Sequence, residues 1–215
     1  MLSLLGANWS TFLLGFWNTI LCSLISLFFS LIIGSGFAIL ETVPNKFWRA
    51  VAKVYVEIFR NIPLLVVTMV FYLVLPTYTP LKLTGFQAGT IGLSIYSSAF
   101  IAETVRSGIQ SVGTGQMEGA RSNGMTYMQA MTHVVLPQAL TKMIPALLSQ
   151  FVSLIKDTSL ATIIVLPELL YHAEIIYNQN TNYMIPMYLA VAVMYFIICF
   201  ALSSFANYLS KRIKY

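Results

Sequence analysis

Residues 11–40 read TFLLGFWNTILCSLISLFFSLIIGSGFAIL and contain no charged side chain. A helix needs about 20 predominantly apolar residues to cross a bilayer, so this stretch is long enough to span one. The rest of the chain has the same character, because 58% of its 215 residues are hydrophobic and only 9% are charged. Soluble domains carry about 25% charged residues. The sequence therefore predicts an integral membrane protein.

Four further apolar stretches are candidates for membrane crossings. They cover residues 61–76, 86–109, 134–155 and 185–208. The first of these is short for a span unless it is extended back through residues 51–59. Residues 159–170 form a shorter apolar stretch of ~12 residues, which we interpret as a re-entrant or interfacial segment. We expect an all-α membrane fold with about five transmembrane helices in a single domain, residues 1–215.

Lysine and arginine residues are concentrated in the loops on one side of the predicted membrane. One side holds Lys46, Arg49, Lys53 and Arg60 after the first helix, Arg106, Arg121 and Lys142 around the third and fourth, and Lys211, Arg212 and Lys214 in the tail. Short cytoplasmic loops are enriched in these residues, so we expect a multi-pass protein with its N-terminus outside and its C-terminus in the cytoplasm. Nucleic-acid binding needs a clustered basic face with stacking aromatics, which this spread of charge does not provide.

Residues 110–133, QSVGTGQMEGARSNGMTYMQAMTH, are too polar to cross a membrane. Asn123-Gly124 is a strong turn pair, so we expect one short helix from Gln116, a turn at residues 122–124, and a second short helix. Such a cytoplasmic elbow suits a docking site for another protein. A plain interfacial loop is the alternative interpretation.

This loop resembles the cytoplasmic loop of binding-protein-dependent ABC importer permeases. The resemblance is carried by the block that contains Gln116, Glu118, Gly119, Ala120, Gly124, Leu136 and Pro137. Gly119 stands where the family pattern has alanine, which lowers local helix propensity by up to ~1 kcal/mol. Three further segments resemble the polar amino-acid branch of that family: EIFRNIPLL at 57–65, YSSAFIAETVRSGIQ at 96–110 and KDTSL at 156–160.

The resemblance implies a type I importer permease in the bacterial cytoplasmic (inner) membrane. Two permeases, identical or sister chains, would form an alternating-access pore, and an extracytoplasmic binding protein would deliver an amino acid to it. A dimer of cytoplasmic ABC ATPases would bind ATP and Mg²⁺ and dock on the coupling loop, residues 110–137. Within that loop we expect Gly124 to allow the turn and Pro137 to open the fourth helix.

The chain itself is not expected to be an enzyme. It has no Gly-x-x-x-x-Gly-Lys-Ser/Thr phosphate-binding loop. No set of His and Cys residues has metal-ligand spacing, and we expect neither a cofactor nor a metal on this chain.

Asp157 is the strongest candidate for contact with a substrate inside the membrane. It lies ~20 residues after Pro137, or ~30 Å along an ideal helix, and ionisable groups at such depth usually face a cavity or a partner. Its carboxylate could accept the ammonium group of an amino acid, with Lys156, Thr158 and Ser159 beside it. The alternative is that this run fixes a helix break at a dimer interface.

Four other charged residues within the predicted helices form two pairs with i, i+3 spacing. Glu103 and Arg106 share a helix face, and we expect a structural ion pair there. Glu57 and Arg60 are either an ion pair at the membrane edge or, with Asn61, part of the substrate pathway.

Two other classes of membrane protein remain as alternatives. A channel or stand-alone carrier would show repeats within one chain, and we see none in the sequence. A membrane-embedded enzyme would need a clustered nucleophile and base, which the sequence lacks. Glutamine, glutamate, cystine, arginine and histidine all fit the resemblance as cargo.

Overall fold

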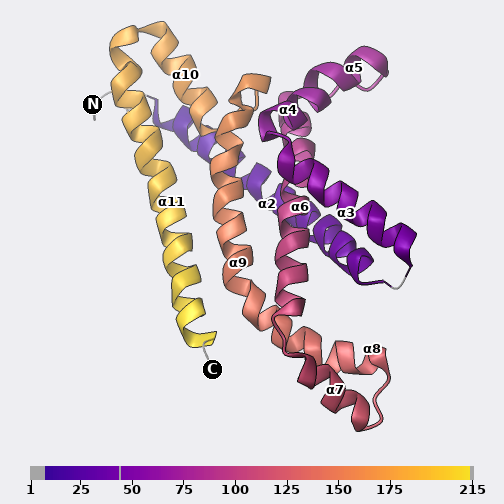
Figure 1. Ribbon diagram of the computed structural model, residues 1–215. Coiled ribbons are helices and arrows are strands. Elements are labelled where there is room, and N and C mark those ends of the chain that lie inside the picture. Colours follow the sequence, from indigo (N-terminus) through magenta and orange to yellow (C-terminus); the bar gives the residue numbers. More distant parts are fainter. Residues whose placement is uncertain (1–7, 44, 214–215) are drawn as a thin grey trace.

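The computed structural model describes residues 8–43 and 45–213, and within these ranges every regular element is a helix (Figure 1). The long helices lie side by side, and one pair of short helices projects from an end of the bundle. The predicted all-α membrane fold is confirmed. The predictions for the segment before Asn8 and for Lys214 fall outside the described residues.

The helices are named as in Figure 1. They are α2 (Trp9–Thr42), α3 (Lys46–Asn61), α4 (Leu64–Met69), α5 (Leu75–Tyr78), α6 (Gly85–Gln110), α7 (Thr114–Ser122), α8 (Tyr127–Ala130), α9 (Leu136–Asp157), α10 (Leu169–Gln179) and α11 (Met184–Ile213). Two segments are π-helical, Val70–Val74 and Met131–Val135, and two are 3₁₀-helical, Thr158–Ile164 and Thr181–Tyr183.

Three helical runs of the described chain are long and apolar enough to cross a membrane: Trp9–Thr42, Tyr127–Ile164 and Thr181–Arg212. The bent pair α3 and α4–α5 makes a fourth if it counts as one span. The remaining predicted crossing, residues 86–109, is α6, whose 26 residues are long enough but less apolar. It packs against α2, α3, α4 and α9, so neighbouring helices rather than lipid cover much of its surface.

Small residues allow α2 and α6 to approach closely. Four-residue steps place Cys22, Ser26, Ser30, Gly34 and Ala38 of α2 against Thr90, Ser94, Ser98 and Ala102 of α6. The hydroxyl of Ser26 donates to the carbonyl of Thr90 at 3.2 Å, and that of Ser30 to the carbonyl of Ser94 at 2.9 Å. Such stripes of small residues are a common basis of helix association in membranes.

Residues 51–59 do not extend the second span as a straight helix. Those residues belong to α3, and the helix that follows is bent away from it by 103°. The cause is Pro63, which lacks an N–H and forces Ile62 into an extended conformation with ψ 136°. As a result α3 runs back along the last part of α2 and packs against α6, and the chain changes direction before α4 (Figure 1).

The stretch 159–170 does not cross the membrane in a single helix. It contains the 3₁₀ segment Thr158–Ile164, a left-handed turn at Val165 with φ 61°, and the start of α10. Ile164 and Leu166 are buried against α4 and α6. The segment therefore folds back into the bundle, which matches its interpretation as a re-entrant piece.

Candidate functional site

The coupling loop forms the predicted helix-turn-helix elbow. The first helix, α7, begins two residues before Gln116 and ends at Ser122. The N–H of Gly124 bonds to the carbonyl of Arg121 at 3.0 Å, and that of Met125 to the carbonyl of Ala120 at 3.3 Å. These two bonds make a Schellman motif, whose C′ residue adopts a left-handed conformation. Gly124 has φ 87°, so this turn favours glycine at that position.

The elbow is attached firmly to the bundle at its base. Val112 is buried with Val135, Ala139 and Met143 of the following helical run. Two bonds connect segments far apart in sequence: the Gln138 side chain donates to that of Gln116 at 3.2 Å, and Lys142 donates to the carbonyl of Ser111 at 2.9 Å. The base therefore holds α7 and α8 in a fixed orientation to α9.

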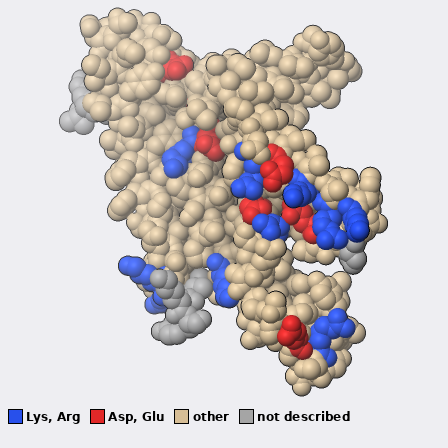
Figure 2. Space-filling model, viewed as in Figure 1, with Lys and Arg blue, Asp and Glu red and all other residues tan. Residues whose placement is uncertain are grey.

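The tip of the elbow is exposed. All residues from Arg121 to Gln129 are exposed, as is Glu118, and their charges form a separate small patch at the end of the molecule in Figure 2. Three apolar side chains are exposed beside them, Met125, Tyr127 and Met128, with Met128 66% exposed. Exposed apolar groups rimmed by polar ones are typical of protein interfaces.

Pro137 lies in the first turn of α9, which begins at Leu136, as the sequence predicts, but helical structure continues into α9 from α8. The run from Tyr127 to Ile164 is a single helix of 38 residues, and Pro137 lies inside it. The π-helical segment Met131–Val135 precedes the proline, and the N–H of Leu136 bonds to the carbonyl of Met131. This wider turn accommodates a residue that lacks an N–H and whose ring would clash with the carbonyl four residues back. A π-helical segment, Val70–Val74, also precedes Pro76, and there the N–H of Leu75 bonds to the carbonyl of Val70.

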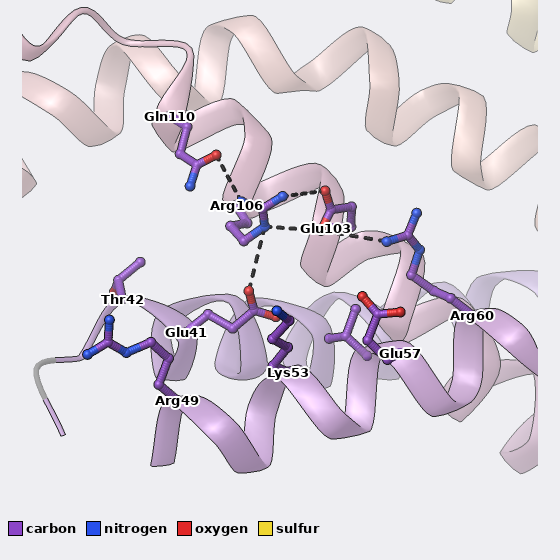
Figure 3. A pocket seen from close by; sticks show the side chains of 10 residues that line it. Glu41, Thr42, Arg49, Lys53, Glu57, Arg60, Glu103, Arg106 and Gln110 are labelled. Carbon is purple, nitrogen blue, oxygen red and sulfur yellow. Dashed lines mark hydrogen bonds and ion pairs between the residues drawn. The ribbon is translucent and has the colours of Figure 1, made fainter. Parts of the chain in front are cut away.

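A cavity of about 420 Å³ opens between α2, α3 and α6, and we call it the charged cavity (Figure 3). Its lining comprises Glu41, Thr42, Arg49, Lys53, Val56, Glu57, Arg60, Glu103, Arg106 and Gln110. The charged residues among them belong to the large patch of blue and red on the front face in Figure 2. The three helices thus bring together charges that are up to 65 positions apart in the sequence.

Arg106 is the centre of this cluster. Its guanidinium lies 2.5 and 3.0 Å from the carboxylate oxygens of Glu103, and 3.5 Å from a carboxylate oxygen of Glu41. Arg60 of α3 approaches Glu103 at 3.8 Å. Glu57 accepts a 3.2 Å hydrogen bond from Asn61. The ion pairs therefore join α2, α3 and α6 rather than bridging Glu57 and Arg60 along one helix.

Asp157 lies in a second cavity, of about 210 Å³, which we call the Asp157 cavity. It is lined by Tyr96, Ser97, Phe100, Gln150, Ser153, Leu154 and Asp157. The two cavities lie near each other, because the Arg60 guanidinium of the charged cavity lies 5.9 Å from the ring centroid of Phe100. A carboxylate, hydroxyls, an amide and aromatic rings together offer both hydrogen-bond acceptors and donors to a small polar ligand.

The residues next to Asp157 in the sequence, Lys156, Thr158 and Ser159, do not line this cavity. Thr158 is fully buried and bonds to the carbonyl of Ile155 and to the Tyr195 hydroxyl. Ser159 donates to the carbonyl of Lys156, and the Lys156 side chain is exposed. Of the other candidate pathway residues, Glu57 and Arg60 line the charged cavity, and Asn61 bonds to Glu57. The structure thus does not bring the candidate pathway residues together in one site.

Comparison with known proteins places the chain in a family. Residues 27–215 match the family described as binding-protein-dependent transport system inner membrane component. The chain belongs to this family. It is 44% identical over 212 residues to the probable glutamine ABC transporter permease protein GlnM of Bacillus subtilis (strain 168), covering 99% of this chain and 97% of that protein. To the probable glutamine permease GlnP of the same strain it is 39% identical, covering 95% and 92%.

Solved structures of ABC transporters share the fold of this family member. An amino acid ABC transporter crystallised with histidines superposes with a TM-score of 0.92 at 31% identity, covering 98% of this chain and 97% of that one. The MetNI methionine ABC transporter superposes with a TM-score of 0.81 at 22% identity, covering 97% and 99%, which shows a common fold. The chain is therefore a membrane-spanning permease of the ABC transporter type.

Several cavity residues of this permease were not singled out from the sequence. Gln150 and Ser153 precede Asp157 by seven and four positions, so all three project from one side of α9. This polar stripe can be recognised in the sequence, so it could have indicated that Gln150 and Ser153 lie near Asp157. Glu41 was missed because its partner, Arg106, lies 65 positions further along the chain. Nothing local to Glu41 indicates such a contact.

Proposed function

We propose that this permease forms half of the pore of an ATP-driven amino-acid importer. A second permease, the same chain or a sister chain, supplies the other half. A cytoplasmic pair of ABC ATPases binds ATP and Mg²⁺ and drives the cycle, and an extracytoplasmic binding protein delivers the amino acid. The observation that carries this proposal is the exposed elbow on a firmly packed base, in a chain that belongs to a binding-protein-dependent family.

The elbow acts as the lever between ATPase and pore. Its tip offers Glu118, Arg121 and the apolar group of Met125, Tyr127 and Met128 to a partner. Because α8 runs without interruption into α9, a movement of the tip is transmitted along the same helix toward Asp157. Closure of the ATPase dimer around ATP would pull the two elbows together and turn the pore outward.

The pore surface includes the polar side of α9. Ser149, Gln150, Ser153 and Asp157 lie on one side of this helix, and all are at least partly exposed in the single chain. Polar and charged groups inside a bilayer are costly against lipid, so this side faces water or the second permease. Asp157 would accept the ammonium group of the amino acid as it passes.

The elbow and the charged cavity lie on the cytoplasmic side, and the Val165 turn lies toward the outside. Support comes from the Lys and Arg residues, which are concentrated at the elbow end, around α3 and at the end of α11. This orientation places the exposed tip where an ATPase can reach it. It also puts the C-terminus in the cytoplasm.

Glutamine is the first substrate to test, since the two Bacillus relatives are described as probable glutamine permeases. Proteoliposomes holding this permease with its ATPase and binding protein should accumulate labelled glutamine or another amino acid only when ATP is enclosed with the ATPase. Uptake without ATP, at the same rate, would instead identify a carrier or channel.

A further inference from the structure

One part of the charged cavity is neutralised by its own ion pairs. The Arg106 guanidinium bonds to Glu103 and lies 3.5 Å from a carboxylate oxygen of Glu41. It also donates to the side chain of Gln110 at 2.9 Å. Arg60 lies 3.8 Å from the same Glu103 carboxylate. Two arginines and two glutamates thus balance one another, and this network offers no net charge to a ligand.

Two further charges of the cavity, Lys53 and Glu57 of α3, stand outside this network. None of the ion pairs in the described part of the chain includes either residue. The Glu57 carboxylate accepts a 3.2 Å hydrogen bond from the neutral amide of Asn61. Lysine precedes glutamate by four positions here, which is the less favourable order for an ion pair along one helix. The cavity therefore holds one cation and one carboxylate whose charges are available to a ligand.

The spacing of these two charges suits a ligand that carries both signs. Lys53 and Glu57 are exposed and line the cavity, and in Figure 3 both side chains rise from α3 towards α2 and α6. Residues four apart on a helix have Cβ atoms about 5–6 Å apart. An α-amino acid carries its ammonium and carboxylate groups on the same carbon atom. Its head group can therefore contact both side chains at once.

The size and the mixed charge of the cavity favour a small zwitterion over other ligands. Its volume of about 420 Å³ is twice that of the Asp157 cavity and falls within the range of about 300–1,000 Å³ that is usual for small-molecule sites. A phosphate or another simple anion would meet three carboxylates, and a simple cation would meet four basic side chains. Ionisable groups on membrane helices face a polar cavity because contact with lipid is costly.

We propose that the charged cavity is a second amino-acid site of this permease, on the cytoplasmic side of the Asp157 cavity. Glu57 binds the ammonium group and Lys53 the carboxylate, so the site recognises the head group that all α-amino acids share. Because Arg60 lies 5.9 Å from the ring centroid of Phe100, the two cavities are close together. An amino acid that leaves Asp157 thus meets a second polar site before the cytoplasm. The choice of an amino acid as ligand rests on the proposed function.

Equilibrium dialysis of the purified full chain in mild detergent, with labelled L-glutamine as the probe, tests this proposal. The Asp157→Asn variant serves as the background, because it removes the charge of the other cavity. We expect this variant to retain binding of L-glutamine. Addition of Glu57→Gln or of Lys53→Gln should weaken that binding by about tenfold, as expected for the loss of one charge-assisted hydrogen bond.

Two analogues of glutamine assign each charge of the head group to its residue. N-acetyl-L-glutamine lacks the ammonium group and should bind the Asp157→Asn variant about tenfold more weakly than L-glutamine does. That difference should disappear when Glu57→Gln is also present. The α-amide of L-glutamine lacks the carboxylate, and its weaker binding should depend on Lys53 in the same way. A purely structural role of either residue would not make the two losses depend on each other.

Matched controls remove a charge of the same type away from the cavity. Glu174→Gln in α10 and Lys211→Gln in α11, each combined with Asp157→Asn, should bind L-glutamine as the background variant does. Absence of binding in the background variant, or unchanged binding after Glu57→Gln and Lys53→Gln, would overturn the proposal. ATP-driven uptake by the unmodified chain without such binding would reject this site alone, whereas binding without ATP-driven uptake would retain the site and reject the importer.

Discussion

Tyr195 of α11 donates a 2.7 Å hydrogen bond to the carboxylate of Glu168, which is fully buried at the start of α10. That carboxylate also accepts from the Thr162 hydroxyl and from the backbone N–H groups of Leu170 and Tyr171, at 2.7 to 2.8 Å. A buried carboxylate needs this number of donors, because burial without them is costly. One side chain thereby connects the 3₁₀ segment, α10 and α11.

Tyr195→Phe should destabilise the permease by ~1–3 kcal/mol, because it removes one donor from a buried charged acceptor. Thermal unfolding in detergent should show a lower Tm. Tyr208→Phe is the matched control, since Tyr208 lies on the same helix and is 50% exposed. Equal Tm values for the two variants would show that the Glu168 contact contributes nothing to stability.

Gly34→Ala should destabilise the contact between α2 and α6. A Cβ at residue 34 would lie 2.5 Å from the carbonyl oxygen of Ser98 and 3.0 Å from the backbone nitrogen of Ala102. Backbone atoms cannot move aside easily, so we expect a cost of ~1–3 kcal/mol. The control is Gly36→Ala on the same helix, where nothing lies within 4 Å. Thermal unfolding should give a lower Tm for Gly34→Ala than for Gly36→Ala. Equal Tm values for the two variants would contradict the close contact between α2 and α6.

The fold class and the elbow were predictable because their signals are local. Long uncharged runs define the helices, and Asn123-Gly124 defines the turn. The bend at Pro63 has a local cause too, but the short apolar stretch 61–76 invited an extension across it. By contrast, the close contact at Gly34 and the hydrogen bond between Tyr195 and Glu168 depend on partners 27 to 68 positions away. A single sequence does not show which distant residues meet.

Glu118→Lys should weaken docking of the ATPase while the permease still inserts and folds. The side chain is exposed at the tip, so reversal of its charge acts on a partner rather than on the fold. Transport and ATPase co-purification should fall together.

The elbow offers two glycine controls. Gly119→Ala meets nothing within 4 Å and should leave docking intact. Gly124→Ala is strained at φ 87°, so it should reduce docking by displacing α8. Normal transport in Glu118→Lys would contradict the docking role.

Asp157→Asn should reduce amino-acid uptake while leaving the ATPase bound. The substitution keeps the size of the side chain but removes the negative charge that would hold the ammonium group. Uptake at several substrate concentrations would show a raised apparent KM. Ser149→Ala, on the same side of α9 but outside the Asp157 cavity, is the control. An unchanged KM in Asp157→Asn would remove this residue from the substrate pathway.

The most direct test of the proposed function is a pull-down of the tagged chain from native membranes in mild detergent, followed by mass spectrometry. We predict an ATPase with a Gly-x-x-x-x-Gly-Lys-Ser/Thr loop in the purified complex, and its loss in the Glu118→Lys variant. A chain that purifies without an ATPase, and transports amino acids in proteoliposomes without ATP, would contradict the account.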